Sequence, residues 1–345
     1  MEDIESYCLS LINEAITKKA TDIHIMINSN NCTFFYRSSG VFNKWRELPI
    51  RLGERLISHL KYRSGMNLGE QRKPQSMSII HQQNSLFYSL RLSTLPNKQT
   101  EGLVIRILPH HLTYSLSTLA LIPQFSIPLT EIPTFQNGLC LFAGSTGSGK
   151  TTTLYAIIKE LLLNGSKSII SIEDPIEIPI NDIVQVEVSE QTGLTFDASL
   201  RAALRHDPDV LLIGEIRDEV TAALAIRAAL TGHLVLATVH ASDMKTTLLR
   251  LLNLGVKKSD LLECCKMIII QQLVRLHCPI CFNDGEYTCT CKKPLRKALF
   301  DIAKQRELMD LINGHAMRIN QMRQQAKKGW ALGYINDDEL WRCLK

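Results

Sequence analysis

One glycine-rich segment constrains the fold of this 345-residue chain more than any other. Residues 144–151 read Gly-Ser-Thr-Gly-Ser-Gly-Lys-Thr and satisfy in full the phosphate-loop pattern G-x-x-x-x-G-K-[ST]. The apolar run 138–143 before it is typical of a buried strand, and residues 152–163 after it have the pattern of a helix. A glycine-rich turn could match by chance, but strand, glycine loop and helix together are the context that this motif needs. The sequence therefore predicts a binding site for a nucleoside triphosphate, ATP.

Different residues of this loop are expected to contact different parts of the nucleotide. Glycines let backbone N–H groups surround the phosphates, and the helix N-terminus adds a favourable dipole. Lys150 would reach the β- and γ-phosphates, and the Thr151 hydroxyl would hold Mg²⁺. The predicted ATP-binding residues are Gly144, Ser145, Thr146, Gly147, Ser148, Gly149, Lys150, Thr151 and Thr152.

Composition limits the cellular setting. The formal net charge of +5 is mild and the basic residues form no concentrated run, so we expect no direct binding of nucleic acid. The N-terminus lacks the apolar region of a secretory signal, and no apolar run approaches the ~18–20 residues that span a bilayer. These features predict a cytoplasmic protein whose membrane association is peripheral. Ten cysteines in such a chain indicate reduced thiols or a metal site rather than disulfides.

The periodicity of apolar residues divides the chain into four parts. Residues 1–108 mix a helix near the N-terminus with strand-like runs, which predicts a small α/β domain. Residues 109–136 lose periodicity and contain recurring prolines, which is typical of a linker. Residues 137–255 alternate strands with helices and predict a mostly parallel sheet covered on both faces. Residues 256–345 read as helical, interrupted by a cluster of cysteines.

The chemistry of the α/β part is expected at the carboxyl ends of its strands, where ligands collect in open α/β sheets. An apolar strand at 210–213 has Asp209 before it and Glu215 after it. At ~3.3 Å per residue these carboxylates lie roughly 16–20 Å apart, so only one can sit at the phosphates. The phosphate loop follows its own strand, so Glu215 is on the correct side and is the candidate for polarising the attacking water. Asp209 is expected to brace the start of the strand.

Two further strands place candidates at the same edge. Glu173 and Asp174 come directly after a strand that ends at Ile172, and both suit Mg²⁺ or its waters. His240 ends the strand 234–239 and could contact the γ-phosphate, whereas His233 begins that strand and is expected to be structural. A histidine beside a strand can also be a packing residue, which is the alternative for His240.

Four blocks in this order resemble the secretion ATPases of type II secretion and type IV pilus systems. Residues 144–155 resemble their Walker A segment, 171–177 their Asp box, 204–218 their Walker B segment and 231–240 their His box. A generic RecA-like kinase or helicase would match only the first block. The resemblance spans about residues 12–280 and includes Ala20-Thr21-Asp22-Ile23-His24 in the N-terminal part.

The resemblance implies a RecA-like P-loop domain preceded by a PAS-like α/β domain and followed by a helical region. It implies a homo-hexamer in which Arg91 and Arg106 contact the phosphates, and a polytopic inner-membrane platform protein as the partner. Two segments, 73–77 and 96–102, depart from the family's pattern. A short chain that contains Arg275-Leu276-His277-Cys278-Pro279-Ile280-Cys281 resembles the competence traffic ATPases of Gram-positive bacteria most.

The cysteine cluster provides four thiols at Cys278, Cys281, Cys289 and Cys291, the number that a closed tetrahedral zinc site requires. The first pair has the usual spacing of a zinc knuckle, and the second pair has one intervening residue instead of two. We expect a structural Zn²⁺ here, with unliganded cytosolic thiols as the alternative. Cys264 and Cys265 lie in an apolar stretch read as helical and are expected in the core.

The combined interpretation is a hexameric, Mg-ATP-dependent motor that assembles a competence pseudopilus for DNA uptake. Three alternatives stay open at this level: a general type IV pilus or type II secretion motor, a scaffold that binds ATP with little turnover, and a DNA-translocating RecA-like motor. The carboxylates of Glu215 and Glu173 argue against the scaffold.

Overall fold

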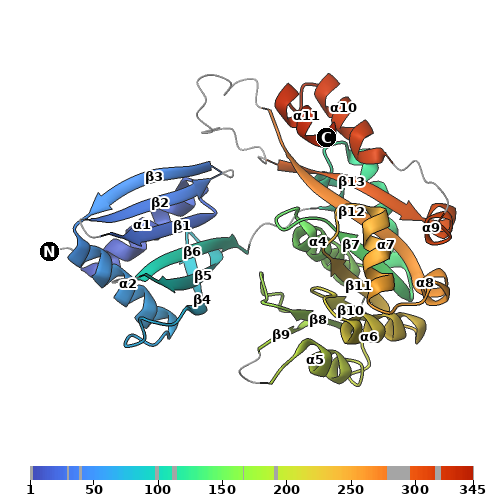
Figure 1. Cartoon of the computed structure of the whole chain (residues 1–345), viewed down its shortest axis with the longest axis horizontal. Helices are drawn as coiled ribbons and strands as arrows, with labels where there is room; N and C mark the ends of the chain where they lie inside the picture. The colour runs from blue at the N-terminus through green and yellow to red at the C-terminus, as the bar shows by residue number, and fades with distance from the viewer. Residues whose placement is uncertain are drawn as a thin grey trace. The chain divides into compact units, whose positions relative to one another are not determined.

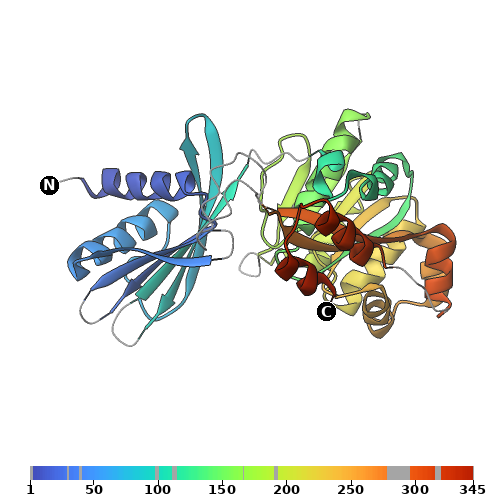
Figure 2. The same ribbon diagram turned by 90° about the horizontal axis from the view of Figure 1, so that it is seen from above.

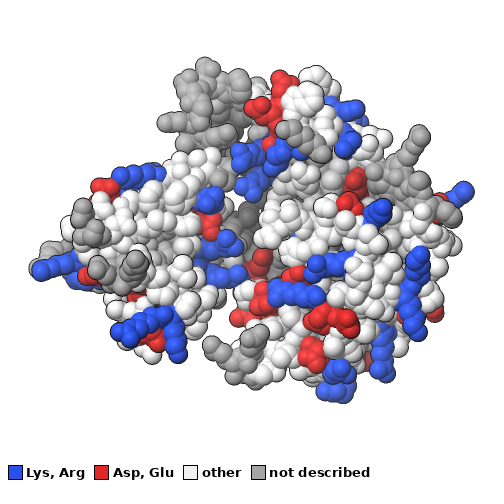
Figure 3. All heavy atoms as spheres, viewed as in Figure 1, with Lys and Arg blue, Asp and Glu red and all other residues white. Residues whose placement is uncertain are grey.

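The chain folds into two compact units, Met1–Leu112 and Thr113–Lys345, coloured blue to cyan and green to red in Figure 1. The computed structural model describes residues 3–28, 31–38, 41–97, 101–110, 115–165, 167–189, 193–277, 296–314 and 320–344. Basic and acidic side chains are interspersed over the face drawn in Figure 3, in keeping with the small net charge.

The first unit is a six-stranded antiparallel sheet with two helices on one face (Figure 2). The strand order is β3-β2-β1-β6-β5-β4. Alternate residues such as Ile25, Leu90 and Ile105 point to the covered face and are fully buried, because successive side chains of a strand face opposite ways. The elements are α1 (Ile4–Thr17), β1 (Asp22–Ile27), β2 (Cys32–Ser38), β3 (Val41–Leu48), α2 (Ile50–Ser64), β4 (Gln75–Gln83), β5 (Leu86–Pro96) and β6 (Glu101–Pro109).

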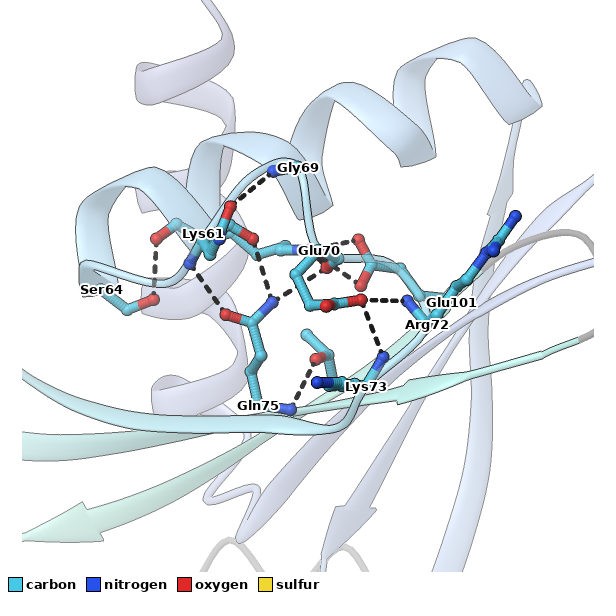
Figure 4. Close-up of polar contacts among 10 residues, drawn as sticks. Lys61, Ser64, Gly69, Glu70, Arg72, Lys73, Gln75 and Glu101 are labelled. Atoms are coloured by element: carbon cyan, nitrogen blue, oxygen red, sulfur yellow. Dashed lines mark hydrogen bonds and ion pairs between the residues drawn. The ribbon is translucent and has the colours of Figure 1, made fainter. Parts of the chain in front are cut away.

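A buried lysine ties several of these elements together (Figure 4). Lys61 of α2 is 1% exposed, and its Nζ donates to both carboxylate oxygens of Glu101 at 2.9 and 3.0 Å and to the Glu70 carbonyl at 2.9 Å. The Gln75 side chain donates to that same carbonyl at 3.0 Å. Gln75 and Glu101 each belong to one of the two segments that depart from the family's pattern, and both side chains contribute to the contacts around this buried, paired charge.

The second unit is built on a seven-stranded sheet of order β13-β12-β7-β11-β10-β8-β9. All pairs are parallel except β12 with β13. Apolar cores cover both faces, one formed with α4 and the segment 116–132 and the other with α5 to α9. The strands are β7 (Gly138–Ala143), β8 (Ile169–Glu173), β9 (Val184–Glu187), β10 (Val210–Ile213), β11 (Leu234–Val239), β12 (Cys265–Arg275) and β13 (Arg296–Lys304). The helices are α4 (Lys150–Leu163), α5 (Phe196–Ala203), α6 (Glu219–Leu230), α7 (Met244–Asn253), α8 (Lys258–Cys264), α9 (Gln305–Ile312), α10 (Gln321–Ala331) and α11 (Asp337–Leu344). The predicted α/β class with a mostly parallel sheet is confirmed.

The segment expected as a flexible linker, 109–136, belongs largely to the second unit. It forms α3 (Leu116–Leu119) and the 3₁₀ helices η1 (Pro123–Phe125) and η2 (Ile127–Thr134). Leu129 and Ile132 are fully buried in the same core as α4. Pro123 begins η1, Pro128 lies in the first turn of η2 and Pro133 lies inside η2, so the prolines here belong to packed 3₁₀ helices and their recurrence was a poor indicator of a linker.

The C-terminal part contains two strands that the sequence analysis did not predict. The region read as helical from 256 does contain α8 to α11, but β12 pairs with β7 and β13 pairs with β12. Residues 267–270 are all apolar and all buried, so the sequence of β12 does not alternate between apolar and polar residues at this point. A short apolar run of this kind is compatible with either a strand or a helix, which is why the strand was missed. Cys264 ends α8 and Cys265 begins β12, and both are buried as expected.

Candidate active site

The phosphate loop connects β7 to α4 at the carboxyl edge of the sheet. Gly149 caps α4 with φ +86°, a left-handed conformation that favours glycine. A Cβ at Gly144 would lie 2.5 Å from the Gln271 carbonyl oxygen, so glycine is also needed there for space. The Lys150 Nζ donates to the loop's own carbonyls, at 2.7 Å to Gly144 and 3.1 Å to Ser145. These contacts hold the ammonium over the loop whose backbone would surround the phosphates.

Two acidic residues influence the charge of the Lys150 ammonium in the phosphate loop. Desolvation lowers the pKa of the Lys150 ammonium, while the charges of Glu215 and Glu177 act in the opposite direction. Glu215 follows β10 and Glu177 follows β8, so two strand ends contribute acids that act on the same cation. Sequence reasoning selected Glu215 and missed Glu177, although Glu177 belongs to the recognised block 171–177.

A buried glutamine braces the loop from the strand that the sequence analysis missed. Gln271 of β12 is 3% exposed. Its Oε1 accepts from the Thr153 hydroxyl at 2.8 Å, and its Nε2 donates to the Ser148 carbonyl at 2.8 Å. Both ends of the amide are therefore used, one on α4 and one on the phosphate loop. A polar residue inside the apolar run of β12 was the only signal in the sequence.

Polar side chains that follow three different strands meet around Glu215. Its Oε2 accepts from Arg217 Nε at 2.6 Å, and its Oε1 lies 3.4 Å from His240 Nε2. Arg217 Nη1 also donates to Asp174 Oδ2 at 2.9 Å. The predicted neighbourhood of Glu215, Asp174 and His240 is thus found, and Arg217 joins it. Arg217 stands two residues after Glu215 in the recognised Walker B block, but sequence reasoning did not select it.

Glu173 is close to this group in sequence but is held in a buried site of its own. It is 4% exposed. Its Oε1 accepts from Ser171 at 2.8 Å and from Gln185 at 3.1 Å, and its Oε2 accepts from the Tyr155 hydroxyl at 2.5 Å. Burial raises the pKa of this carboxyl group. Three donors occupy most of its acceptor sites, so the donor set fits Mg²⁺ through a bound water better than by direct contact.

The residues expected away from the phosphates lie at the opposite ends of their strands. The Asp209 carboxylate accepts from the backbone N–H of Ser168 at 2.7 Å and so braces the start of β8. His233 Nδ1 lies 3.0 Å from the Ala228 carbonyl, at the end of α6. Both contacts agree with the structural roles predicted for Asp209 and His233.

Arg91 and Arg106 belong to the first unit and are direct partners in the β5–β6 ladder. Arg106 is paired with Asp22, with Nε 3.0 Å from Oδ1, although its own side chain is 57% exposed. The Nε of Arg91 is buried and has no hydrogen-bond partner among the described residues. Two arginines therefore stand side by side on one face of the sheet.

The predicted zinc site at Cys278, Cys281, Cys289 and Cys291 lies outside the described residues. In the part of the chain that the structure describes, His, Cys, Asp and Glu residues form no further group of three or more that could hold a metal ion. That part of the chain also has no helix with the length and apolar character needed to cross a bilayer.

Comparisons with known proteins agree with this geometry. The chain is 38% identical over 343 residues to the competence protein ComGA of Halalkalibacterium halodurans and 37% identical over 350 residues to that of Bacillus subtilis, covering 98% of each relative and 98% and 99% of this chain. It is 37% identical to the type II secretion system protein E of Klebsiella pneumoniae over 79% of this chain and 55% of that protein. Among solved structures, the pilus retraction motor PilT with bound ADP superposes with a TM-score of 0.75 at 26% identity, covering 97% of this chain and 96% of that one. The family described as "Type II/IV secretion system protein" matches residues 1–330, and the chain therefore belongs to this family and is an ATPase of the secretion and pilus type.

Proposed function

We propose that this protein is a hexameric, Mg-ATP-dependent motor that powers assembly of a competence pseudopilus for DNA uptake. The observation that carries the ATPase chemistry is the group of charges around Glu215 at the carboxyl edge, beside the phosphate loop. The assignment to competence is supported by end-to-end similarity to two relatives named as competence proteins.

Each residue of the site has a proposed role. Residues 144–152 bind the phosphates, with Lys150 at the β- and γ-phosphates and the Thr151 hydroxyl on Mg²⁺. Glu215 polarises the attacking water, and His240, which shares the Glu215 carboxylate, contacts the γ-phosphate. Glu173 acts on Mg²⁺ through water because its oxygens already accept three hydrogen bonds. When bound, the ion would neutralise phosphate charge.

Arg91 and Arg106 are proposed to supply positive charge to the phosphates when the two units move against each other across subunit boundaries. Like charges directly opposite each other on a sheet are unfavourable, and the single carboxylate of Asp22 compensates only part of this pair. An anion such as a phosphate would relieve the repulsion. Hydrolysis is thereby coupled to motion, and the motion is passed to a polytopic inner-membrane platform protein, which gives the protein a cytoplasmic, peripherally membrane-associated location.

Deletion of the gene and complementation with Glu215→Gln tests the cellular function. We expect loss of DNA uptake and of pseudopilus fibres in both the deletion and the variant, and restoration of both by the wild-type chain. Normal DNA uptake with loss of another fibre or of a secreted protein would instead support the alternative, a general type IV pilus or type II secretion motor. Hydrolysis stimulated by DNA alone would contradict the proposal and favour a DNA translocase.

A structural Zn²⁺ on the four cysteines is proposed from the sequence alone. Metal analysis of protein purified without chelator should give one zinc per chain. A stoichiometry near zero, with four freely titratable thiols at these positions in the native protein, would exclude it.

A further inference from the structure

Arg217 joins two carboxylates that come from the ends of neighbouring strands. Its Nε is 2.6 Å from Glu215 Oε2, and its Nη1 is 2.9 Å from Asp174 Oδ2. We propose that Arg217 is a positioning residue for ATP hydrolysis, which holds the Glu215 carboxylate in place by anchoring it to Asp174. This inference rests on the proposed role of Glu215 as the group that polarises water.

The backbone beneath Glu215 is already fixed on both sides. Gly214 N–H donates to the Ile172 carbonyl of β8 at 2.8 Å, and Ile216 N–H donates to the Thr238 carbonyl of β11 at 2.9 Å. A Cβ at Gly214 would lie 2.9 Å from the Ile172 oxygen, so this close approach requires glycine. Placement of the carboxylate is then decided by the rotatable bonds of the Glu215 side chain alone.

Arg217 restricts those bonds because it holds one oxygen while His240 lies near the other. Oε2 accepts from Arg217, and Oε1 is 3.4 Å from His240 Nε2. The Glu215 side chain is only 13% exposed, whereas that of Arg217 is 51% exposed. The guanidinium makes both contacts with different nitrogens, a geometry that a single lysine ammonium does not reproduce.

The opposite role for the same contacts is a latch that restrains Glu215 and slows hydrolysis. The two roles predict opposite changes in turnover, so kinetics separate them. A bridge that only braces the loops would change folding stability without a selective effect on kcat.

The test is steady-state ATPase kinetics of the full-length chain carrying Arg217→Ala, Arg217→Lys, Asp174→Asn and the Arg217→Ala/Asp174→Asn pair. We expect Arg217→Ala to lower kcat roughly 10- to 100-fold with KM for ATP changed less than about 3-fold, because misplacement of a reacting group by an ångström has effects of this order. Arg217→Lys should restore part of kcat, and Asp174→Asn should lower it less than Arg217→Ala does. The double variant should be no slower than Arg217→Ala, because both changes break one bridge.

Arg201→Ala is the matched control, since Arg201 is 55% exposed and pairs with Asp197 outside the site. Unchanged or raised kcat in Arg217→Ala, additive losses in the double variant, or a rise in KM alone would each overturn the proposal. If Arg217→Ala does not fold, the Arg217→Lys and Asp174→Asn variants carry the same test. Full turnover in Glu215→Gln would defeat the role of Glu215 itself, whereas an inactive Glu215→Gln with a fully active Arg217→Ala would defeat only the role of Arg217.

Discussion

The two sheets of this protein place their candidate functional side chains in different ways. In the mostly parallel sheet of the second unit, the candidate residues follow the strands and meet at one edge, as Glu215 and His240 do. In the antiparallel sheet of the first unit, Arg91 and Arg106 lie in the middle of strands and meet through their register on one face. The first arrangement can be derived from strand order and direction, and the second depends on the pairing of strands that only the folded sheet defines.

The largest effects are expected at the edge of the parallel sheet. Lys150→Ala and Glu215→Gln should each abolish steady-state hydrolysis, with losses of about 10³-fold or more. Lys150→Ala removes a cation from the phosphates and should weaken ATP binding, whereas Glu215→Gln should leave binding nearly intact. Binding of a fluorescent ATP analogue, measured beside turnover, checks this. Equally poor ATP binding in both variants would show that Glu215 contributes to nucleotide binding and does not act only on the attacking water.

Arg91 and Arg106 test whether the face of the antiparallel sheet serves the same reaction. Alanine at either position should lower turnover by about 10²- to 10³-fold, since an arginine supplied to a transferring phosphoryl group is worth ~10³–10⁵ in rate and its neighbour remains. ATP binding and the hexamer should persist, as judged by analogue binding and light scattering. A fragment that begins at Thr113 should likewise bind ATP with little turnover. If both single variants turn over at the wild-type rate, the first unit serves only for docking.

The Lys61–Glu101 pair tests how far the first unit is independent of the second. Lys61→Met leaves the nearly buried Glu101 carboxylate without its cation and should lower the free energy of unfolding of the first unit by about 3–5 kcal/mol. The second unit should still bind ATP. Thermal unfolding of the variant measures the loss of stability of the first unit, and binding of the fluorescent ATP analogue shows whether the second unit is intact. Lys18→Met, which breaks an exposed pair with Glu14 at 3.6 Å, is the control and should change stability by less than about 0.5 kcal/mol.

Gln271 gives the smallest expected effect and concerns the phosphate loop alone. Gln271→Leu leaves the Ser148 carbonyl without its donor and the Thr153 hydroxyl without its acceptor, at about 1–3 kcal/mol. If that cost falls on the ATP-bound loop, ATP affinity should fall roughly 5- to 150-fold, which corresponds to the same range of binding free energy. Isothermal titration calorimetry with ATP measures this affinity. The control is Gln272→Leu, a substitution at the half-buried neighbouring residue. Unchanged affinity would mean that the loop keeps its shape without this brace.

Sequence reasoning went furthest where the pattern is local. The strand, loop and helix around Lys150 were located because a glycine-rich turn between two regular elements is read directly from consecutive residues. The parallel sheet and the edge that carries Glu215 and His240 followed from alternation of strands and helices. The proline-containing segment 116–134 was read as a linker because its burial against α4 involves residues distant in sequence.

The sequence by itself therefore determined where the glycine-rich loop lies between strand and helix, the class of the sheet and the edge at which Glu215 and His240 lie. Tertiary structure alone decided that β12 supports the phosphate loop through Gln271, that Arg91 stands beside Arg106, and that Arg217 bridges Glu215 to Asp174. The physical reason is the sequence separation of the interacting residues. Secondary-structure propensities, glycine turns and hydrophobic periodicity depend on residues only a few positions apart. The side-chain partners of these residues are instead set by strand pairing and packing between segments up to 123 positions apart.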